Sequence, residues 1–283
     1  MRPPDVEASE PVQVVVRPEV PVLAHTRSGT GEPLILVHGI THRREAWDTV
    51  TPFLEKEHDV IAVDLPGHGD SEDVAPDFDG SPTPLVDAVE GLARDLGLER
   101  PHVAGNSLGG LIALEMAARG TVASATALSP AGFWSPIGRT WARGVLSGAS
   151  AALRHMSPER LDRVLAGPAG RAALTGLIMA HPGRQDPEVL ARGLQGLARP
   201  REGFAAMLAG LDRWTAPQRS DVPTMVGWGN RDYLLPRAQI RRLRQVLPDA
   251  HVVVLPSCGH IPMADDPALV AEVILGNARL ARV

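Results

Sequence analysis

Short apolar runs that alternate with helix-like stretches constrain the fold of this chain more than any other feature of its sequence. The runs are Leu34–Val37, Val60–Val63, Pro101–Gly105 and Ala123–Leu128. Runs that are apolar on both faces are typical of strands buried between two layers of helices, as in a parallel sheet. The sequence therefore predicts an α/β fold with right-handed crossovers between its strands.

The rest of the expected sheet lies toward the two ends of the chain. Gln13–Val16 and Val20–His25 are short apolar stretches that predict an antiparallel hairpin, and residues 1–10 predict a flexible tail. Pro223–Gly227 and His251–Leu255 predict two further strands, each followed by a helical stretch. Together the runs predict a mostly parallel, eight-stranded sheet flanked by helices.

The alternation stops at Ala131 and resumes near Asp221, which divides the chain into a core and an insertion. Between residues 131 and 215 no strand-like run occurs, and the composition is rich in alanine, leucine, arginine and glycine. We therefore expect residues 11–130 and 216–283 to form the core. Residues 131–215, the inserted segment, are expected to form an all-helical cap after the sixth strand.

The sharpest chemical signal is the sequence Gly-Asn-Ser-Leu-Gly-Gly at residues 105–110, where a predicted strand ends and a predicted helix begins. A nucleophilic serine needs such a setting, because a tight turn presents its hydroxyl at the sheet end and glycines avoid clashes there. The following helix offers its positive end and the N–H of Leu108 to an oxyanion. The motif alone is common in glycine-rich chains, but its position favours Ser107 as a nucleophile.

With this motif in that position, the chain resembles the α/β-hydrolase superfamily. Two other segments are similar to superfamily motifs: His38-Gly39-Ile40 after the first buried run, and Asp-Leu-Pro-Gly-His-Gly-Asp-Ser at residues 64–71. The resemblance implies that the N–H groups of Ile40 and Leu108 form an oxyanion hole. It also implies that the turn at residues 64–71 is structural.

Two further residues complete the resemblance. Asp232 follows the strand at residues 223–227, and His260 follows the strand at residues 251–255. The order serine, aspartate, histidine is the one expected for this fold, and α/β sheets place their ligand sites at the carboxyl ends of strands. The resemblance implies Ser107 as the nucleophile, His260 as the general base and Asp232 as the acid that orients the histidine.

Other interpretations of the reactive side chains are weaker. Asp221 precedes its strand and is expected at the opposite end of the sheet, and Cys258 has no glycine turn around it, so we interpret it as a packing residue. His38 and His42 are four residues apart, but no third ligand pattern accompanies them. We therefore expect no metal site, and the serine mechanism implied by the resemblance requires neither a metal nor an organic cofactor.

The resemblance implies cleavage of an ester-type bond, in a carboxylic ester, thioester or lactone, through an acyl-enzyme on Ser107. Because a fold does not fix a reaction, other functions remain open. Two are reactions: hydrolysis of a carbon–carbon bond in a diketone, and a cofactor-free perhydrolase or haloperoxidase activity. A third, of another class, is a ligand-binding receptor that uses the same pocket without turnover.

The cap is expected to cover the nucleophile and to shape a pocket for a small to medium apolar substrate. It carries 11 arginines and six acidic residues, and we interpret the arginines as a solvated helix face. The expected substrate contacts are His38, Asn106, Phe133, Trp134, Phe204 and Met263.

The composition argues against several classes of protein. A formal net charge of −5 disfavours nucleic acid as the main partner, and the single cysteine excludes an intramolecular disulfide. Neither a signal-peptide pattern nor an apolar run of membrane-spanning length occurs, so we expect a cytoplasmic protein. The expected partner is a small-molecule acyl substrate, and the expected state is a monomer or a small homo-oligomer.

Overall fold

The computed structural model describes residues 21–198, 202–217 and 219–281. In this part of the chain, seven strands form one sheet in the order β1-β3-β2-β4-β5-β6-β7. β1 is antiparallel to β3, and the other neighbouring strands are parallel. The strands are β1 His25–Ser28, β2 Glu32–Val37, β3 His58–Val63, β4 His102–Asn106, β5 Ser124–Leu128, β6 Thr224–Gly229 and β7 His251–Leu255.

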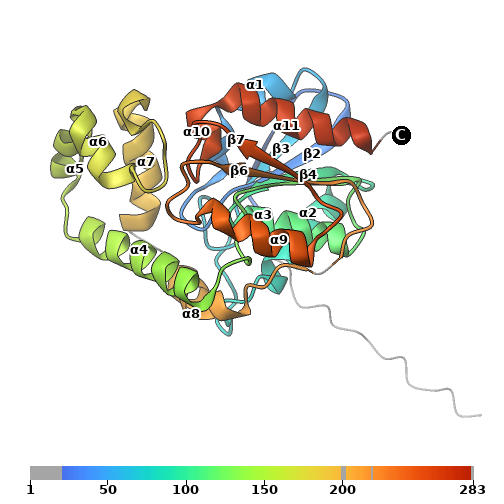
Figure 1. Ribbon diagram of the computed structural model, residues 1–283, viewed down its shortest axis with the longest axis horizontal. Helices are drawn as coiled ribbons and strands as arrows, with labels where there is room; N and C mark the ends of the chain where they lie inside the picture. Colours follow the sequence, from blue (N-terminus) through green and yellow to red (C-terminus); the bar gives the residue numbers. More distant parts are fainter. Residues whose placement is uncertain (1–20, 199–201, 218, 282–283) are drawn as a thin grey trace, which may run out of the picture.

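Helices cover both faces of the sheet, as predicted for strands that are apolar on both sides (Figure 1). α1 and α11 lie on one face, and α2, α3 and α9 lie on the other. Every residue of β4 and β5 is buried between these layers. The helices are α1 Thr51–Leu54, α2 Thr83–Asp95, α3 Leu108–Ala118, α9 Ile240–Val246, α10 Pro262–Asp265 and α11 Pro267–Leu280. Across the described ranges, no helix combines the length and the apolar character needed to cross a bilayer.

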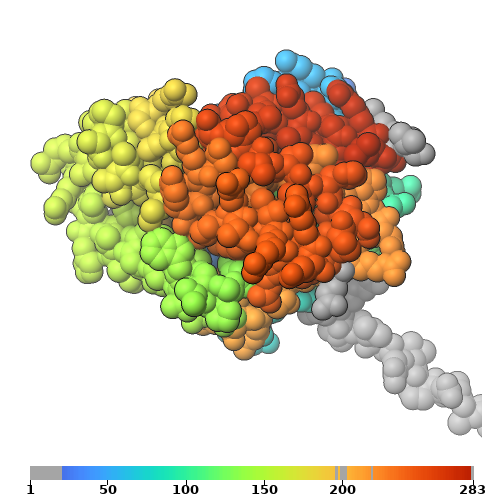
Figure 2. Space-filling view, viewed as in Figure 1, coloured from blue at the N-terminus to red at the C-terminus, as the bar shows by residue number. Residues whose placement is uncertain are grey.

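The described residues of the inserted segment form helices and connecting turns, between β5 and β6. A proline in the first turn starts four of these helices, as its fixed φ and missing N–H favour. Figure 2 shows the yellow-green helices of the segment on one side of the core, next to the orange and red part of the chain that follows β6. Its helices are α4 Pro136–Arg154, α5 Pro158–Ala166, α6 Pro168–Thr175, α7 Pro187–Ala198 and α8 Glu202–Ala209.

One arginine of the inserted segment is structural rather than solvated. Arg171 is buried, and its guanidinium donates to the carbonyl oxygens of Leu165 at 2.7 Å, Ala166 at 3.0 Å and Gly183 at 2.9 Å. These bonds occupy acceptors at the end of α5 and in the turn after α6. The interpretation of the arginines as a solvated helix face is therefore wrong for Arg171.

The N-terminal edge of the sheet differs from the predicted one. Residues 21–24 form no regular element, and the strand begins at His25 rather than at Val20. Pro21 has no N–H to donate to a strand ladder, which disfavours a strand across it. β1 pairs with β3, with His25 opposite Val63. Gln13–Val16 and the expected tail lie outside the described residues, so the hairpin and the count of eight strands stay predictions.

Candidate active site

Ser107 lies on a tight turn between the end of β4 and the start of α3. Its backbone has φ 56° and ψ −112°, and a positive φ is uncommon for a residue with a side chain and typical of functional turns. The neighbouring glycines allow the turn. A side chain at Gly105 would collide with the carbonyl oxygen of Gly109, and a side chain at Gly109 would collide with that of Val37.

His260 and Asp232 lie on the loops after β7 and β6, and their side chains are hydrogen-bonded. Nδ1 of His260 is 2.9 Å from Oδ2 of Asp232, and both residues are buried. The other carboxylate oxygen accepts the N–H groups of Leu234 at 3.1 Å and Leu235 at 2.7 Å. Three hydrogen bonds hold the carboxylate in one orientation. When Nδ1 donates to it, Nε2 keeps a lone pair that can accept a proton.

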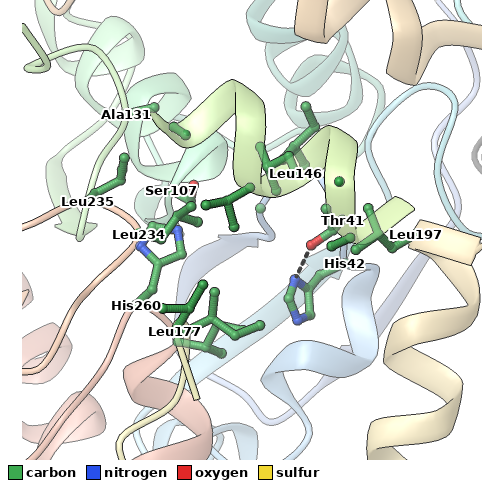
Figure 3. A pocket seen from close by; sticks show the side chains of 18 of the residues that line it. Thr41, His42, Ser107, Ala131, Leu146, Leu177, Leu197, Leu234, Leu235 and His260 are labelled. Carbon is green, nitrogen blue, oxygen red and sulfur yellow. Dashed lines mark hydrogen bonds between the residues drawn. The ribbon is translucent and has the colours of Figure 1, made fainter. Parts of the chain in front are cut away.

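Asn106 joins the turn of Ser107 to the loop of His260. Its Nδ2 donates to the carbonyl oxygen of Leu128 at 3.0 Å and to that of His260 at 2.8 Å. Ser107 and His260 line the same cavity (Figure 3). The structure thus brings the three predicted catalytic residues to one end of the sheet, with Asp232 behind the imidazole of His260.

The loop after β2 passes close to Ser107. Gly39 and Ile40 line the cavity, and a Cβ atom at Gly39 would lie 3.3 Å from Cβ of Ser107. Nε2 of His68 is 2.7 Å from the carbonyl oxygen of Ile40, which fixes the loop. In the described part of the chain, the N–H groups of Ile40 and Leu108 have no protein acceptor. These are the two groups predicted to form the oxyanion hole.

The turn at residues 64–71 supports the loops around the site. Asp64 is buried, and its carboxylate accepts the N–H of Arg44 at 2.7 Å and that of Asp70 at 2.9 Å. It also pairs with the Arg44 guanidinium. The carboxylate is therefore committed to the framework, as expected for a structural turn.

A cavity of about 370 Å³ lies between the sheet end and the inserted segment. Leucines and alanines of α4, α6 and α7 form much of its wall, and the stacked indoles of Trp134 and Trp214 also line it. No Asp, Glu, Lys or Arg is among the described residues that line it. Apart from the two indoles, the polar side chains in the lining are Thr41, His42, Asn106, Ser107 and His260.

The model of the alpha/beta hydrolase family matches residues 34–273 of this chain, from β2 into α11. The chain belongs to this family. The matched region contains the turn of Ser107 and the loops of Asp232 and His260.

Relatives of this hydrolase carry different names. It is 30% identical over 254 residues to the dihydrolipoyllysine-residue acetyltransferase component of the acetoin cleaving system of Pseudomonas putida, covering 88% of this chain and 64% of that protein. It thus spans less than two thirds of that relative. It is 29% identical to the pimeloyl-[acyl-carrier protein] methyl ester esterase of Aeromonas hydrophila, covering 88% of this chain and 96% of that protein.

A solved structure of an esterase is also similar to the hydrolase. The thermophilic esterase from Thermogutta terrifontis superposes with a TM-score of 0.72 at 26% sequence identity. The superposition covers 92% of this chain and 94% of that chain, so the fold is shared over nearly the full length of both.

Two of the six predicted substrate contacts, Asn106 and Trp134, line the cavity of the hydrolase. The other four are buried outside the lining, which corrects their placement: His38, Phe133, Phe204 and Met263. Two hydrogen bonds keep the ring of His38 outside the cavity lining. Nε2 accepts the N–H of Leu65 at 3.0 Å, and Nδ1 lies 2.8 Å from the carbonyl oxygen of Gly39. Phe133 instead packs against the ring of Trp228.

Sequence reasoning missed Asp265, at the end of α10. Its Oδ2 accepts the N–H of Gly259 at 2.7 Å and that of Ala180 at 3.0 Å, and its Oδ1 accepts that of His181 at 2.9 Å. This carboxylate ties the loop that carries His260 to the inserted segment. An acid five residues after the predicted base was the only signal in the sequence.

Two other side chains considered from the sequence, those of Cys258 and Asp221, lie outside the cavity lining. Burial, together with Asp265 and Asp266, raises the pKa of the Cys258 thiol to about 12, so the thiol stays protonated. Asp221 is exposed before β6 and pairs with Arg219 at 3.1 Å. Neither residue competes with Ser107 or Asp232.

Among the described residues, Glu32, His58 and His102 form a cluster whose side chains could hold a metal ion. They stand at the amino ends of β2, β3 and β4, so the cluster lies at the sheet end opposite Ser107. Nδ1 of His58 is 2.9 Å from the carbonyl oxygen of Glu32, and Nε2 of His102 is 3.3 Å from Oε2 of Glu32. His58 thus contacts the main chain of Glu32, and His102 contacts its carboxylate.

Proposed function

We propose that this hydrolase cleaves an ester-type bond, in a carboxylic ester, thioester or lactone, of a small to medium apolar substrate. The observation that carries the proposal is the shared cavity. The side chains of Ser107 and His260 line the same mainly apolar cavity. Asp232 is hydrogen-bonded to Nδ1 of His260, which leaves Nε2 for the proton of the serine. A base beside a serine activates its hydroxyl, and oxyanion donors act strongly where water is excluded.

Each residue has a distinct role in this proposal. Nε2 of His260 takes the proton of the Ser107 hydroxyl during attack on the scissile carbonyl and gives it to the leaving group. Asp232 holds the imidazole and stabilises its protonated form. The N–H groups of Ile40 and Leu108 bind the oxyanion, and one such donor is worth about 2.7–4 kcal/mol in a comparable site. Water, activated by His260, then releases the acyl group.

We propose that the inserted segment is a cap that selects the substrate and supplies none of the catalytic groups. Two observations support this. The side chains of α4, α6 and α7 form much of the cavity wall, and Asp265 holds the segment against the loop of His260. A wall built from leucine and alanine discriminates by length and shape rather than by charge.

Replacing Trp134 by alanine should shift the preferred acyl chain toward longer esters by about one or two carbons, since a methylene in such a pocket is worth about 1–3 kcal/mol. We expect KM to change more than kcat, measured on esters of graded length. Phe204→Ala is the matched control, because Phe204 is a buried aromatic residue of the same segment outside the cavity lining. An unchanged length profile in Trp134→Ala would contradict the proposed role of the cap.

A fluorophosphonate probe and a substrate panel test the proposed reaction together. We expect the probe to label Ser107 and the protein to turn over chromogenic esters in many cycles. The panel includes thioesters, lactones and a diketone of similar size. If only the diketone were turned over, the proposed reaction would be hydrolysis of a carbon–carbon bond instead of an ester bond. Stoichiometric labelling without turnover of any substrate would contradict an enzymatic function and favour a ligand-binding receptor.

A further inference from the structure

The cavity holds a second imidazole, that of His42, which the proposed reaction does not use. His42 lies on the loop that follows β2, two residues after the predicted oxyanion donor Ile40. Figure 3 shows its ring on the opposite side of the cavity from Ser107 and His260, below Leu146 of α4. The ring is partly buried, and it is one of few polar side chains in a mainly apolar wall.

The ring is held so that one nitrogen is available to a ligand. Nδ1 of His42 lies 3.2 Å from the hydroxyl oxygen of Thr41. In the described part of the chain, Nε2 of His42 has no protein partner. The backbone is also fixed, because the N–H of His42 donates to the carbonyl oxygen of Gly39 at 3.0 Å. Nε2 therefore has a set position relative to the predicted oxyanion hole.

The chemistry of the cavity indicates what Nε2 of His42 can bind. Burial, with smaller effects of His260 and His68, lowers the pKa of His42 to about 4, so its ring is neutral wherever a histidine base is active. The described lining holds no cationic side chain to pair with an anion, and an unpaired buried charge is very costly. An uncharged ligand oxygen, such as that of a ketone or a hydroxyl, therefore suits this position better than an anion.

We propose that Nε2 of His42 hydrogen-bonds a second, uncharged oxygen of the substrate, so that the preferred substrates are keto- or hydroxyacyl esters rather than plain acyl esters. This inference rests on the proposed ester hydrolysis. The oxygen belongs to the acyl part, because that part becomes bonded to Ser107 in the acyl-enzyme and stays in the cavity until water releases it. His42 is thus a positioning residue that selects the acyl group and anchors it away from the scissile carbonyl.

Matched pairs of esters test this role. The two esters of a pair have the same leaving group and the same acyl chain length, and one of them carries a keto or hydroxyl group. The position of this group along the acyl chain differs from pair to pair. We expect the wild type to prefer the oxygenated member of at least one pair in kcat/KM. In His42→Leu this preference should fall by about five- to tenfold, the value of one hydrogen bond. His42→Gln, which keeps an amide donor, should retain more of it, and the loss should lie mainly in KM.

The control is His155→Leu, which removes an exposed histidine of the inserted segment and should leave the preference at the wild-type value. A second measurement needs no variant: an oxygenated acyl ketone should protect Ser107 from the phosphonate better than a plain one of equal length. A wild type without preference in any pair, or an unchanged preference in His42→Leu, would overturn the role of His42. Either result leaves ester hydrolysis standing, whereas failure of labelling and turnover would remove the proposed function itself.

Discussion

Ser107→Ala should lose at least about three decades of kcat, because without the nucleophile only the oxyanion donors and substrate binding remain. The fold should survive, because the Ser107 hydroxyl has no hydrogen bond in the described structure and alanine accepts the same backbone turn about as well as serine. Steady-state kinetics on the best ester of the panel measure the loss. Thermal unfolding and phosphonate labelling, followed by mass spectrometry, are read on the same preparation.

Ser129→Ala is the matched control for this variant. Ser129 is also a buried serine with a positive φ, of 43°, directly after the neighbouring strand β5. Among the described residues its hydroxyl has no hydrogen-bond partner, and it does not line the cavity, so its removal should leave activity near the wild-type value. Labelling of a serine other than Ser107, or full activity of Ser107→Ala, would show that the nucleophile is misassigned.

The strands and the loops that carry the site could be predicted from the sequence because their signals are local. A buried strand appears in the sequence as an apolar run. The turn of Ser107 appears as a glycine motif, because the backbone around Gly105 and Gly109 is too close to admit a side chain. The edge of the sheet was harder. A strand was expected over residues 20–25, but the N–H groups of Val22 and Ala24 donate to the side chains of Glu72 and Ser71. The pairing of β1 with β3 also joins residues far apart in the sequence.

The cavity wall could not be predicted residue by residue. Leu146 and Leu197 face the cavity while Phe133 and Phe204 are buried elsewhere, yet all four are apolar residues at helical or loop positions near the site. Which apolar side chain faces a cavity depends on how the helices of the inserted segment dock, and periodicity carries no information on docking. His42 did carry a usable signal, because it follows Ile40 on a loop already assigned to the site.

The choice of acid is tested by Asp232→Asn, for which we expect a loss of up to about four decades in kcat, the size seen in a comparable triad. The physical reason is specific to this site. Oδ1 of Asp232 accepts two backbone N–H groups, of Leu234 and Leu235, so the asparagine oxygen must stay there and its amide nitrogen must face His260. Nδ1 of His260 then becomes an acceptor, the proton moves to Nε2, and the ring can no longer take the proton of Ser107.

This variant preserves shape and every backbone hydrogen bond, so its effect should appear in kcat with little change in the melting temperature. Asp221→Asn is the control, since that carboxylate is exposed before β6 and pairs only with Arg219 among the described residues. It should keep nearly full activity. If Asp232→Asn stays active, or if Asp221→Asn proves to be the crippling change, the carboxylate that orients His260 has been chosen wrongly. Phosphonate labelling should also slow in Asp232→Asn, because the probe reacts with a serine that the histidine has activated.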